Sequence, residues 1–212
     1  MKKNYLIVFC LSLGLLLACN KRGNFIIATD VEKIVLNASK NGLTVEEGSR
    51  LGVLIHDSIK KNTIGKTLPN VLVSNLSHEK LNLFDELDKG NNDFILVSSD
   101  IYCGFGLDCI SNIFPKSFKK FRAKNKDINA FCLIVRTEYD KSDSSRFNET
   151  INELKPLYNS IYIIEEKEIR KLNMYASPSR LYVTKDMVVK NITFGINIMT
   201  GDLYEEIEQN AK

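Results

Sequence analysis

Apolar positions along this chain follow two different spacings, and each spacing indicates one kind of secondary structure. Short apolar or alternating runs that end in polar or turn-forming residues are typical of strands. Positions repeating every three or four residues are typical of helices with one buried face. The predicted strands lie at 71–74, 81–83, 94–97, 129–135, 161–164, 181–184 and 187–192, and the predicted helices at 31–38, 45–61, 109–122, 144–159, 165–172 and 200–209.

The order of these elements predicts an α/β fold. From residue 94 onward strands alternate with helices, and a helical crossover joins parallel strands. Hairpins at 71–83 and 181–192 add antiparallel strands to the sheet. We therefore expect a mixed sheet flanked by helices on both faces, preceded by an N-terminal helical extension.

The stretch from Asp93 to Pro115 carries the candidate chemistry. A buried strand ends in Ser98-Ser99-Asp100, and Cys103 and Cys109 follow, separated by a loop that contains two glycines. Helical spacing begins at Cys109, so we expect that thiol at a helix N-terminus, where the dipole favours the thiolate. A second thiol within reach could then resolve a mixed disulfide. A fixed structural disulfide, or two small apolar residues in a surface loop, are the alternatives.

The N-terminus has the pattern of a targeting segment. Lys2 and Lys3 precede an apolar stretch at 5–17, which is too short for a stable membrane span. Leu16-Leu17-Ala18-Cys19 resembles the lipobox of bacterial lipoproteins, which implies removal of residues 1–18 and acylation of Cys19. We then expect a lipid-anchored protein on the periplasmic or outer-membrane face of a bacterial cell. An ordinary secretory signal with an incidental cysteine is the alternative.

Charge and motif content narrow the function classes. Residues 1–18 hold two lysines and no acid, so their removal lowers the net charge from +3 to +1. This near-neutral balance argues against a nucleic-acid partner. The sequence has no zinc-ligand spacing, phosphate-binding glycine loop or serine nucleophile motif, so we expect neither a metal nor a cofactor. His56 and His78 have no catalytic motif around them, and we interpret them as ordinary structural or solvated residues.

After processing, about 190 residues would form an extension at 19–63 and one domain at 64–212. Cys132 lies in the apolar run 130–135, which predicts a buried, inert thiol. With Cys19 acylated, Cys103 and Cys109 are the natural pair in an oxidising compartment.

Residues 65–210 resemble thioredoxin-like proteins of the membrane-tethered redoxin branch, relatives of peroxiredoxins and thiol-disulfide oxidoreductases. The resemblance rests on Gly65-Lys66-Thr67-Leu68-Pro69, on Tyr102-Cys103-Gly104, on Cys109 with Pro115 in its helix, and on Ser177-Pro178 at the position of the cis-proline. It implies thiol-disulfide exchange with protein thiols or disulfides at Cys103 and Cys109. It also implies a substrate groove formed by Tyr102, Ser177 and Pro178.

The spacing of the two cysteines departs from that family. Five residues separate Cys103 from Cys109, where the family has two. A disulfide needs Cα atoms within about 7 Å, which a glycine-bearing loop permits without guaranteeing it. Asp108 would oppose ionisation of Cys109 through like charge, so the sequence leaves open which thiol attacks. The rival functions are a redox-inactive binding module with a fixed disulfide, and a structural surface lipoprotein.

Overall fold

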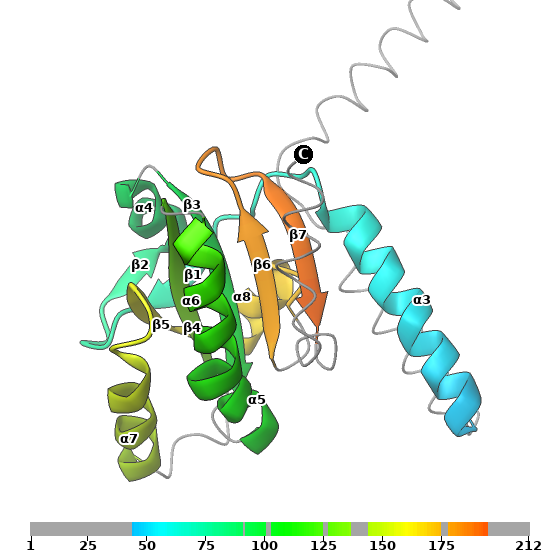
Figure 1. Cartoon of the computed structure of the whole chain (residues 1–212), viewed down its shortest axis with the longest axis horizontal. Coiled ribbons are helices and arrows are strands. Elements are labelled where there is room, and N and C mark those ends of the chain that lie inside the picture. The colour runs from blue at the N-terminus through cyan, green and yellow to red at the C-terminus, as the bar shows by residue number, and fades with distance from the viewer. Residues whose placement is uncertain are drawn as a thin grey trace, which may run out of the picture.

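A seven-stranded sheet with strand order β2-β1-β5-β4-β3-β6-β7 forms the centre of the protein (Figure 1). The computed structural model describes residues 44–90, 92–100, 103–124, 127–136, 144–174 and 178–194. Its strands are β1 (Leu72–Ser74), β2 (Lys80–Asn82), β3 (Asp93–Asp100), β4 (Ile128–Arg136), β5 (Ser160–Glu165), β6 (Ser179–Val183) and β7 (Val189–Phe194). Its α-helices are α3 (Val45–Thr63), α4 (Leu83–Leu87), α5 (Gly104–Asp108), α6 (Phe114–Lys124), α7 (Ser144–Leu154) and α8 (Glu166–Lys171), with a 3-10 turn at Asp88–Gly90 and a π-helical segment at Cys109–Ile113.

The pairing of the strands confirms the predicted mixed sheet. β3, β4 and β5 are parallel to one another, and each connection between them contains a helix. The hairpin β6–β7 adds antiparallel strands beside β3, and the hairpin β1–β2 does the same beside β5. The expected helices at 31–38 and 200–209 lie outside the described residues.

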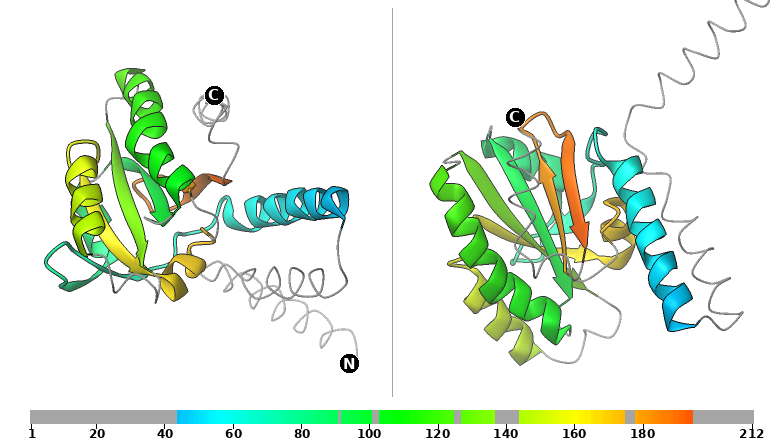
Figure 2. Two further views of the ribbon diagram at one scale, coloured as in Figure 1. Left: turned by 90° about the horizontal axis from the view of Figure 1, so that it is seen from below. Right: turned by 45° about the vertical axis from the view of Figure 1, so that its right-hand side comes forward.

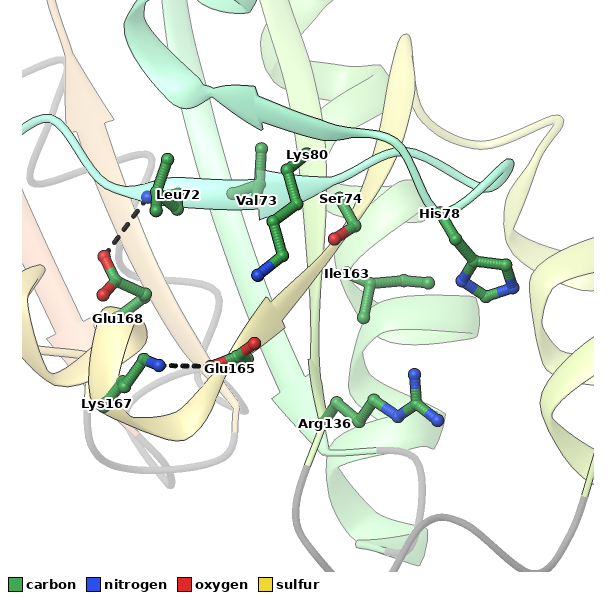
Figure 3. A pocket seen from close by; sticks show the side chains of 10 residues that line it. All are labelled: Leu72, Val73, Ser74, His78, Lys80, Arg136, Ile163, Glu165, Lys167 and Glu168. Carbon is green, nitrogen blue, oxygen red and sulfur yellow. Dashed lines mark hydrogen bonds and ion pairs between the residues drawn. The ribbon is translucent and has the colours of Figure 1, made fainter.

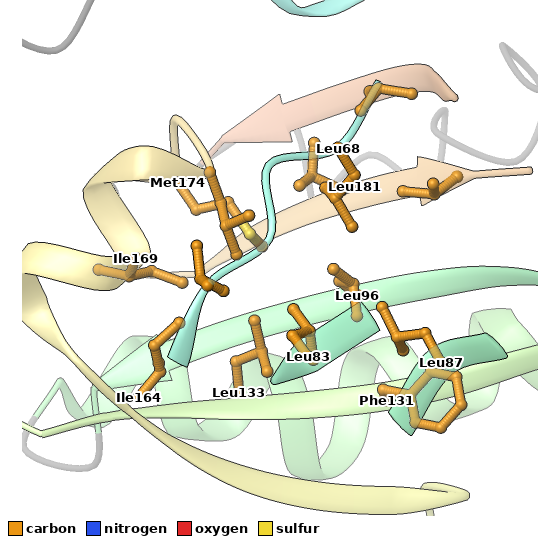
Figure 4. Close-up of a cluster of buried hydrophobic side chains, with 14 of the residues drawn as sticks. Leu68, Leu83, Leu87, Leu96, Phe131, Leu133, Ile164, Ile169, Met174 and Leu181 are labelled. Atoms are coloured by element: carbon orange, nitrogen blue, oxygen red, sulfur yellow. The ribbon is translucent and has the colours of Figure 1, made fainter. Parts of the chain in front are cut away.

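Alternation along the strands divides the core into two layers. On one face, β3 residues Ile95 and Val97 pack beneath α6 and α7. On the other face, Phe94 and Leu96 belong to a cluster that includes side chains of α4 and α8 (Figure 4). Figure 2 shows α6 and α7 together on one side of the sheet and α8 on the opposite side. The helices on both faces were predicted from the element order, and the structure confirms them.

Helix α3 confirms the predicted helix at 45–61. It begins with a capping box in which Thr44 and Glu47 bond to each other's backbone N–H groups. Toward its C-terminal half it packs on β7, where the His56 ring stacks on Phe194 with centroids 5.1 Å apart. Its last residue, the buried Thr63, accepts a hydrogen bond of 2.8 Å from Asn173 Nδ2. In the described ranges, no helix has the length and apolar character needed to cross a bilayer.

Candidate thiol site

Cys103 occupies the N-cap of helix α5. The Leu107 N–H donates to the Cys103 carbonyl at 2.8 Å, which is the first helical hydrogen bond. The Gly106 N–H donates to Cys103 Sγ at 3.3 Å, so the sulfur takes the position of an N-cap side-chain acceptor. The side chain is partly exposed. Cys103 therefore has the helix-terminal position that the sequence had suggested for Cys109.

The predicted loop between the cysteines is wrong, because residues 104–108 are helical. The glycines there have a low helix propensity, which favoured a loop in the sequence. Burial outweighs that preference: Leu107, Ile110 and Phe114 follow one another at helical spacing and all pack in the α6–α7 layer. Helix α5, the π-helical segment and α6 consequently follow one another without a break.

Cys109 is fully buried inside this helical run. Burial raises the pKa of its thiol, and the neighbouring Asp108 carboxylate raises it further. The Arg180 guanidinium acts in the opposite direction on that pKa, but it does not reverse the shift. The expected effect of Asp108 on Cys109 is confirmed in direction, with burial as the larger cause. In the described conformation Cys109 is a protonated, inaccessible thiol.

The two thiols share one helix but are not within bonding distance. Neither forms a disulfide, and Cys109 is six positions after Cys103 along the helical run, which corresponds to a rise of about 9 Å. A disulfide needs Cα atoms no more than about 7 Å apart. Direct pairing of Cys103 with Cys109 therefore requires helix α5 to open.

Pro115 explains the π-helical segment that begins at Cys109. A proline has no N–H to donate, and here the Phe114 N–H bonds to the Cys109 carbonyl, five residues back. The Phe114 N–H is thus not available to the buried Ile110 carbonyl, and Pro115, the next residue, has no N–H to offer. The Tyr158 hydroxyl donates to it at 2.6 Å, from beyond the C-terminal end of α7. The proline on which the family resemblance partly rests thus coincides with a π-bulge in the helix.

Pro178 lies at the same end of the sheet as Cys103. It is buried and directly precedes Ser179, which pairs with Ser98 near the end of β3. Cys103 follows the end of that same strand. The other predicted groove residues, Tyr102 and Ser177, and the predicted lipidation site Cys19 lie outside the described residues, so the groove and the anchor stay predictions.

Arg180 is a residue of this site that sequence reasoning missed. It is 1% exposed, and its guanidinium carbon lies 5.2 Å from the centre of the Phe114 ring. Buried arginines are uncommon because desolvating the charge is costly. The sequence feature that could have pointed to Arg180 was its position, two residues after Pro178 and at the start of an apolar strand.

Cys132 takes no part in the site. It is fully buried in β4, and burial strongly raises the pKa of its thiol, as its apolar neighbours predicted. Within the described part of the chain, no group of three or more histidine, cysteine, aspartate or glutamate side chains is arranged to hold a metal ion.

Comparison with known proteins identifies the fold through solved structures alone. Neither the protein-family models nor the curated proteins give a match. Among solved structures, a thioredoxin-like protein from Porphyromonas gingivalis superposes with a TM-score of 0.51 and 12% identity over 70% of this chain and 92% of that chain. The chain has a thioredoxin-like fold.

Two further solved structures have similar scores. The thioredoxin domain of a thiol-disulfide oxidoreductase from Bacteroides vulgatus gives a TM-score of 0.50 and 12% identity over 71% of this chain and 99% of that chain. A structure from Aquifex aeolicus that is assigned as an electron transfer protein gives a TM-score of 0.50 and 13% identity over 70% of this chain and 92% of that chain. At identities this low, the superpositions establish the thioredoxin-like fold alone. Any activity must be argued from the residues of the site.

Proposed function

We propose that this protein carries out thiol-disulfide exchange with Cys103 as the attacking thiol. The observation that supports this most is the Gly106 N–H aimed at Cys103 Sγ at 3.3 Å, at the N-terminus of a helix. Backbone donors and the positive end of the helix dipole stabilise a thiolate more than a thiol. Partial exposure leaves that sulfur accessible to a partner, whereas Cys109 is buried.

The proposed step moves two electrons in two exchanges. The Cys103 thiolate attacks one sulfur of a partner disulfide, forms a mixed disulfide, and releases the other partner sulfur as a thiolate. In the described conformation a second external thiol resolves that intermediate. Resolution by Cys109 requires helix α5 to open and the Cys109 thiol to lose its proton to water. The Cys103–Cys109 disulfide then forms and the second partner sulfur leaves.

We also propose the cellular setting that the N-terminal pattern indicates. Acylation at Cys19 would anchor the domain to a membrane on the periplasmic or outer-membrane side, where disulfides persist. The partners would be protein thiols or disulfides. The thiol-disulfide oxidoreductase named among the structural neighbours is consistent with that class of partner.

Trapping of mixed disulfides tests the attacking residue. We expect Cys109→Ala in a Cys132→Ala background to form a mixed disulfide with oxidised glutathione, and Cys103→Ala in the same background to form none. If Cys103 in the native protein is inert toward both oxidised glutathione and alkylating reagents, a redox-inactive binding module replaces the exchange function.

The reduction potential of the pair tests the second step. Titration of the Cys132→Ala chain against glutathione, read by alkylation mass shift, should show a reversible two-electron transition between about −270 and −120 mV. A bridge that resists reduction below about −300 mV would indicate a fixed structural disulfide instead. A chain in which only Cys103 is modified, always by an external thiol, would limit the function to single-thiol exchange.

A further inference from the structure

A small pocket lies at the carboxyl end of strands β4 and β5, outside the thiol site. Arg136 is the last residue of β4 and Glu165 the last of β5. The pocket has a volume of about 80 Å³, and its lining includes Ser74, His78 and Lys80 from the β1–β2 hairpin (Figure 3). In open α/β sheets, ligands bind preferentially outside the carboxyl ends of the parallel strands.

The acidic residues of this pocket already have basic partners. Glu165 pairs with Lys167 at 2.7 Å, and the buried Glu168 pairs with Lys171 at 2.6 Å. Glu168 also accepts the Leu72 N–H at 3.2 Å. These contacts leave the two carboxylates neutralised by lysines at the rim.

Lys80 and Arg136 differ from those lysines. In the described ranges, neither side chain has a hydrogen-bond or ion-pair partner at contact distance, although both charges help to lower the pKa of Glu165. Lys80 is on β2 and Arg136 is on β4, and the pairings of β2 with β1, of β1 with β5 and of β5 with β4 bring these distant segments into one sheet. Glu165 is the anion of the pocket on which both charges act, but its carboxylate is already paired with Lys167, so Lys80 and Arg136 keep donors that it does not occupy at contact distance.

The β1–β2 turn places a third basic group beside these two. Asn75 Oδ1 accepts the N–H groups of Ser77 and Glu79 at 2.9 and 3.0 Å, which fixes the turn. His78 takes a φ of 66° at its tip. Figure 3 shows Lys80, His78 and Arg136 around Ile163 and Ser74, whose hydroxyl is a further donor.

We propose that this pocket binds a phosphate group, with Lys80 and Arg136 as its principal ligands and the Ser74 hydroxyl and His78 as additional donors. An arginine fork and a lysine ammonium are the groups that bind phosphate oxygens most strongly in proteins. A pocket of about 80 Å³ exceeds the 10–15 Å³, on the order of one water-sized sphere, that a single water needs, so it has room for a small oxyanion. The same volume is too small for a nucleotide or a folded peptide segment, so only the phosphate end of a larger ligand would enter.

Calorimetric titration of the full chain with inorganic phosphate, at constant ionic strength kept with chloride, tests this site. We expect saturable binding with a millimolar dissociation constant, as suits a single exposed oxyanion. The double variant Lys80→Ala, Arg136→Ala should weaken that binding at least tenfold. The matched control Lys119→Ala, Lys120→Ala removes two exposed charges from α6 and should leave it unchanged.

Parallel titrations with sulfate, acetate and a glutamate-rich peptide identify the anion class. Phosphate or sulfate binding that only the Lys80 and Arg136 substitutions weaken supports the site. Equal loss in both double variants would mean a general charge effect and would overturn it, as would the absence of saturable phosphate binding. Binding of the acidic peptide without phosphate binding would overturn it in favour of a protein-docking surface. Glutathione exchange at Cys103, measured in the same variants, should be unaffected, which separates this proposal from the thiol function.

Discussion

Replacing Tyr158 with phenylalanine removes one hydrogen bond from the π-helical segment of the cysteine helix. The Tyr158 hydroxyl donates to the Ile110 carbonyl at 2.6 Å, and both residues are buried. The Phe114 N–H, the usual donor to that carbonyl, bonds to Cys109 instead, and Pro115 has no N–H. Among the residues that the structure describes, no backbone N–H of this helix is therefore left to replace the lost donor.

The expected cost follows from the orphaned carbonyl. An unsatisfied buried acceptor costs about 1–3 kcal/mol, which is more than the net value of an ordinary hydrogen bond. The ring itself is kept in Tyr158→Phe, so its stacking on Phe114, with centroids 6.1 Å apart, should persist. The change therefore isolates the hydroxyl from the packing.

Urea unfolding of the full chain, followed by circular dichroism, measures this cost as a lower midpoint at an unchanged m-value. Tyr162→Phe is the matched control, because its hydroxyl donates to Glu86 at 3.1 Å and that carboxylate keeps an ion pair with Lys89 at 2.7 Å. We expect the smaller loss for Tyr162→Phe. If Tyr158→Phe changes the free energy of unfolding by less than about 0.5 kcal/mol, the π-helical segment does not depend on this bond.

Three further predictions concern accessibility, backbone geometry and pH. In the native chain iodoacetamide should label Cys103 and leave Cys109 unlabelled until urea is added; equal native labelling of both would contradict the burial of Cys109. Gly65→Ala should lower the free energy of unfolding in urea by about 1–2 kcal/mol, because Gly65 has a φ of 80°. The control Gly52→Ala should be neutral or stabilising, because Gly52 lies inside α3 and an added Cβ would meet open space there. Burial, followed by the charge of a lysine one turn away, lowers the pKa of His56, so its contribution to stability is complete above about pH 6.5 and is lost as the pH falls below it. The thermal midpoint of His56→Phe should fall less than that of the parent between pH 7.5 and 5, and identical slopes would refute this assignment.

The sheet was predictable because its pattern is local and repeated. Crossover helices between apolar runs specified parallel strands, and those runs became β3, β4 and β5. The end of β3 was less predictable: Ser98 and Ser99 looked like a turn, but both are buried and paired with β4. The polarity of these residues made the strand look three residues shorter than it is. A serine hydroxyl can nevertheless be buried in a strand where it bonds to a neighbouring backbone group.

The candidate site was predictable in its residue types but not in its geometry. Cys103 and Cys109 were identified from their place after a predicted strand and from the resemblance, but the low helix propensity of glycine placed the start of the helix at the wrong cysteine. Arg180 gave no periodic signal, because a buried charge is an exception to the pattern that prediction uses. The pocket near Arg136 depends on the order of the strands: Lys80 on β2 and Arg136 on β4 line the same pocket only because β1 and β5 join their strands.

The five-residue spacing changes what oxidation of this pair would mean. With two intervening residues, thiols three apart on one helix have Cβ atoms about 5–6 Å apart and can pair without unfolding. Here Cys109 lies about one and two-thirds turns beyond Cys103, so a disulfide forms only at the expense of α5. Each 1.4 kcal/mol needed to open that helix raises the reduction potential by about 30 mV, because the reduced form is the one with the intact helix. Helix α5 thus favours the dithiol state, and a partner that binds only the opened segment would shift the pair toward the disulfide by its own binding free energy for that segment.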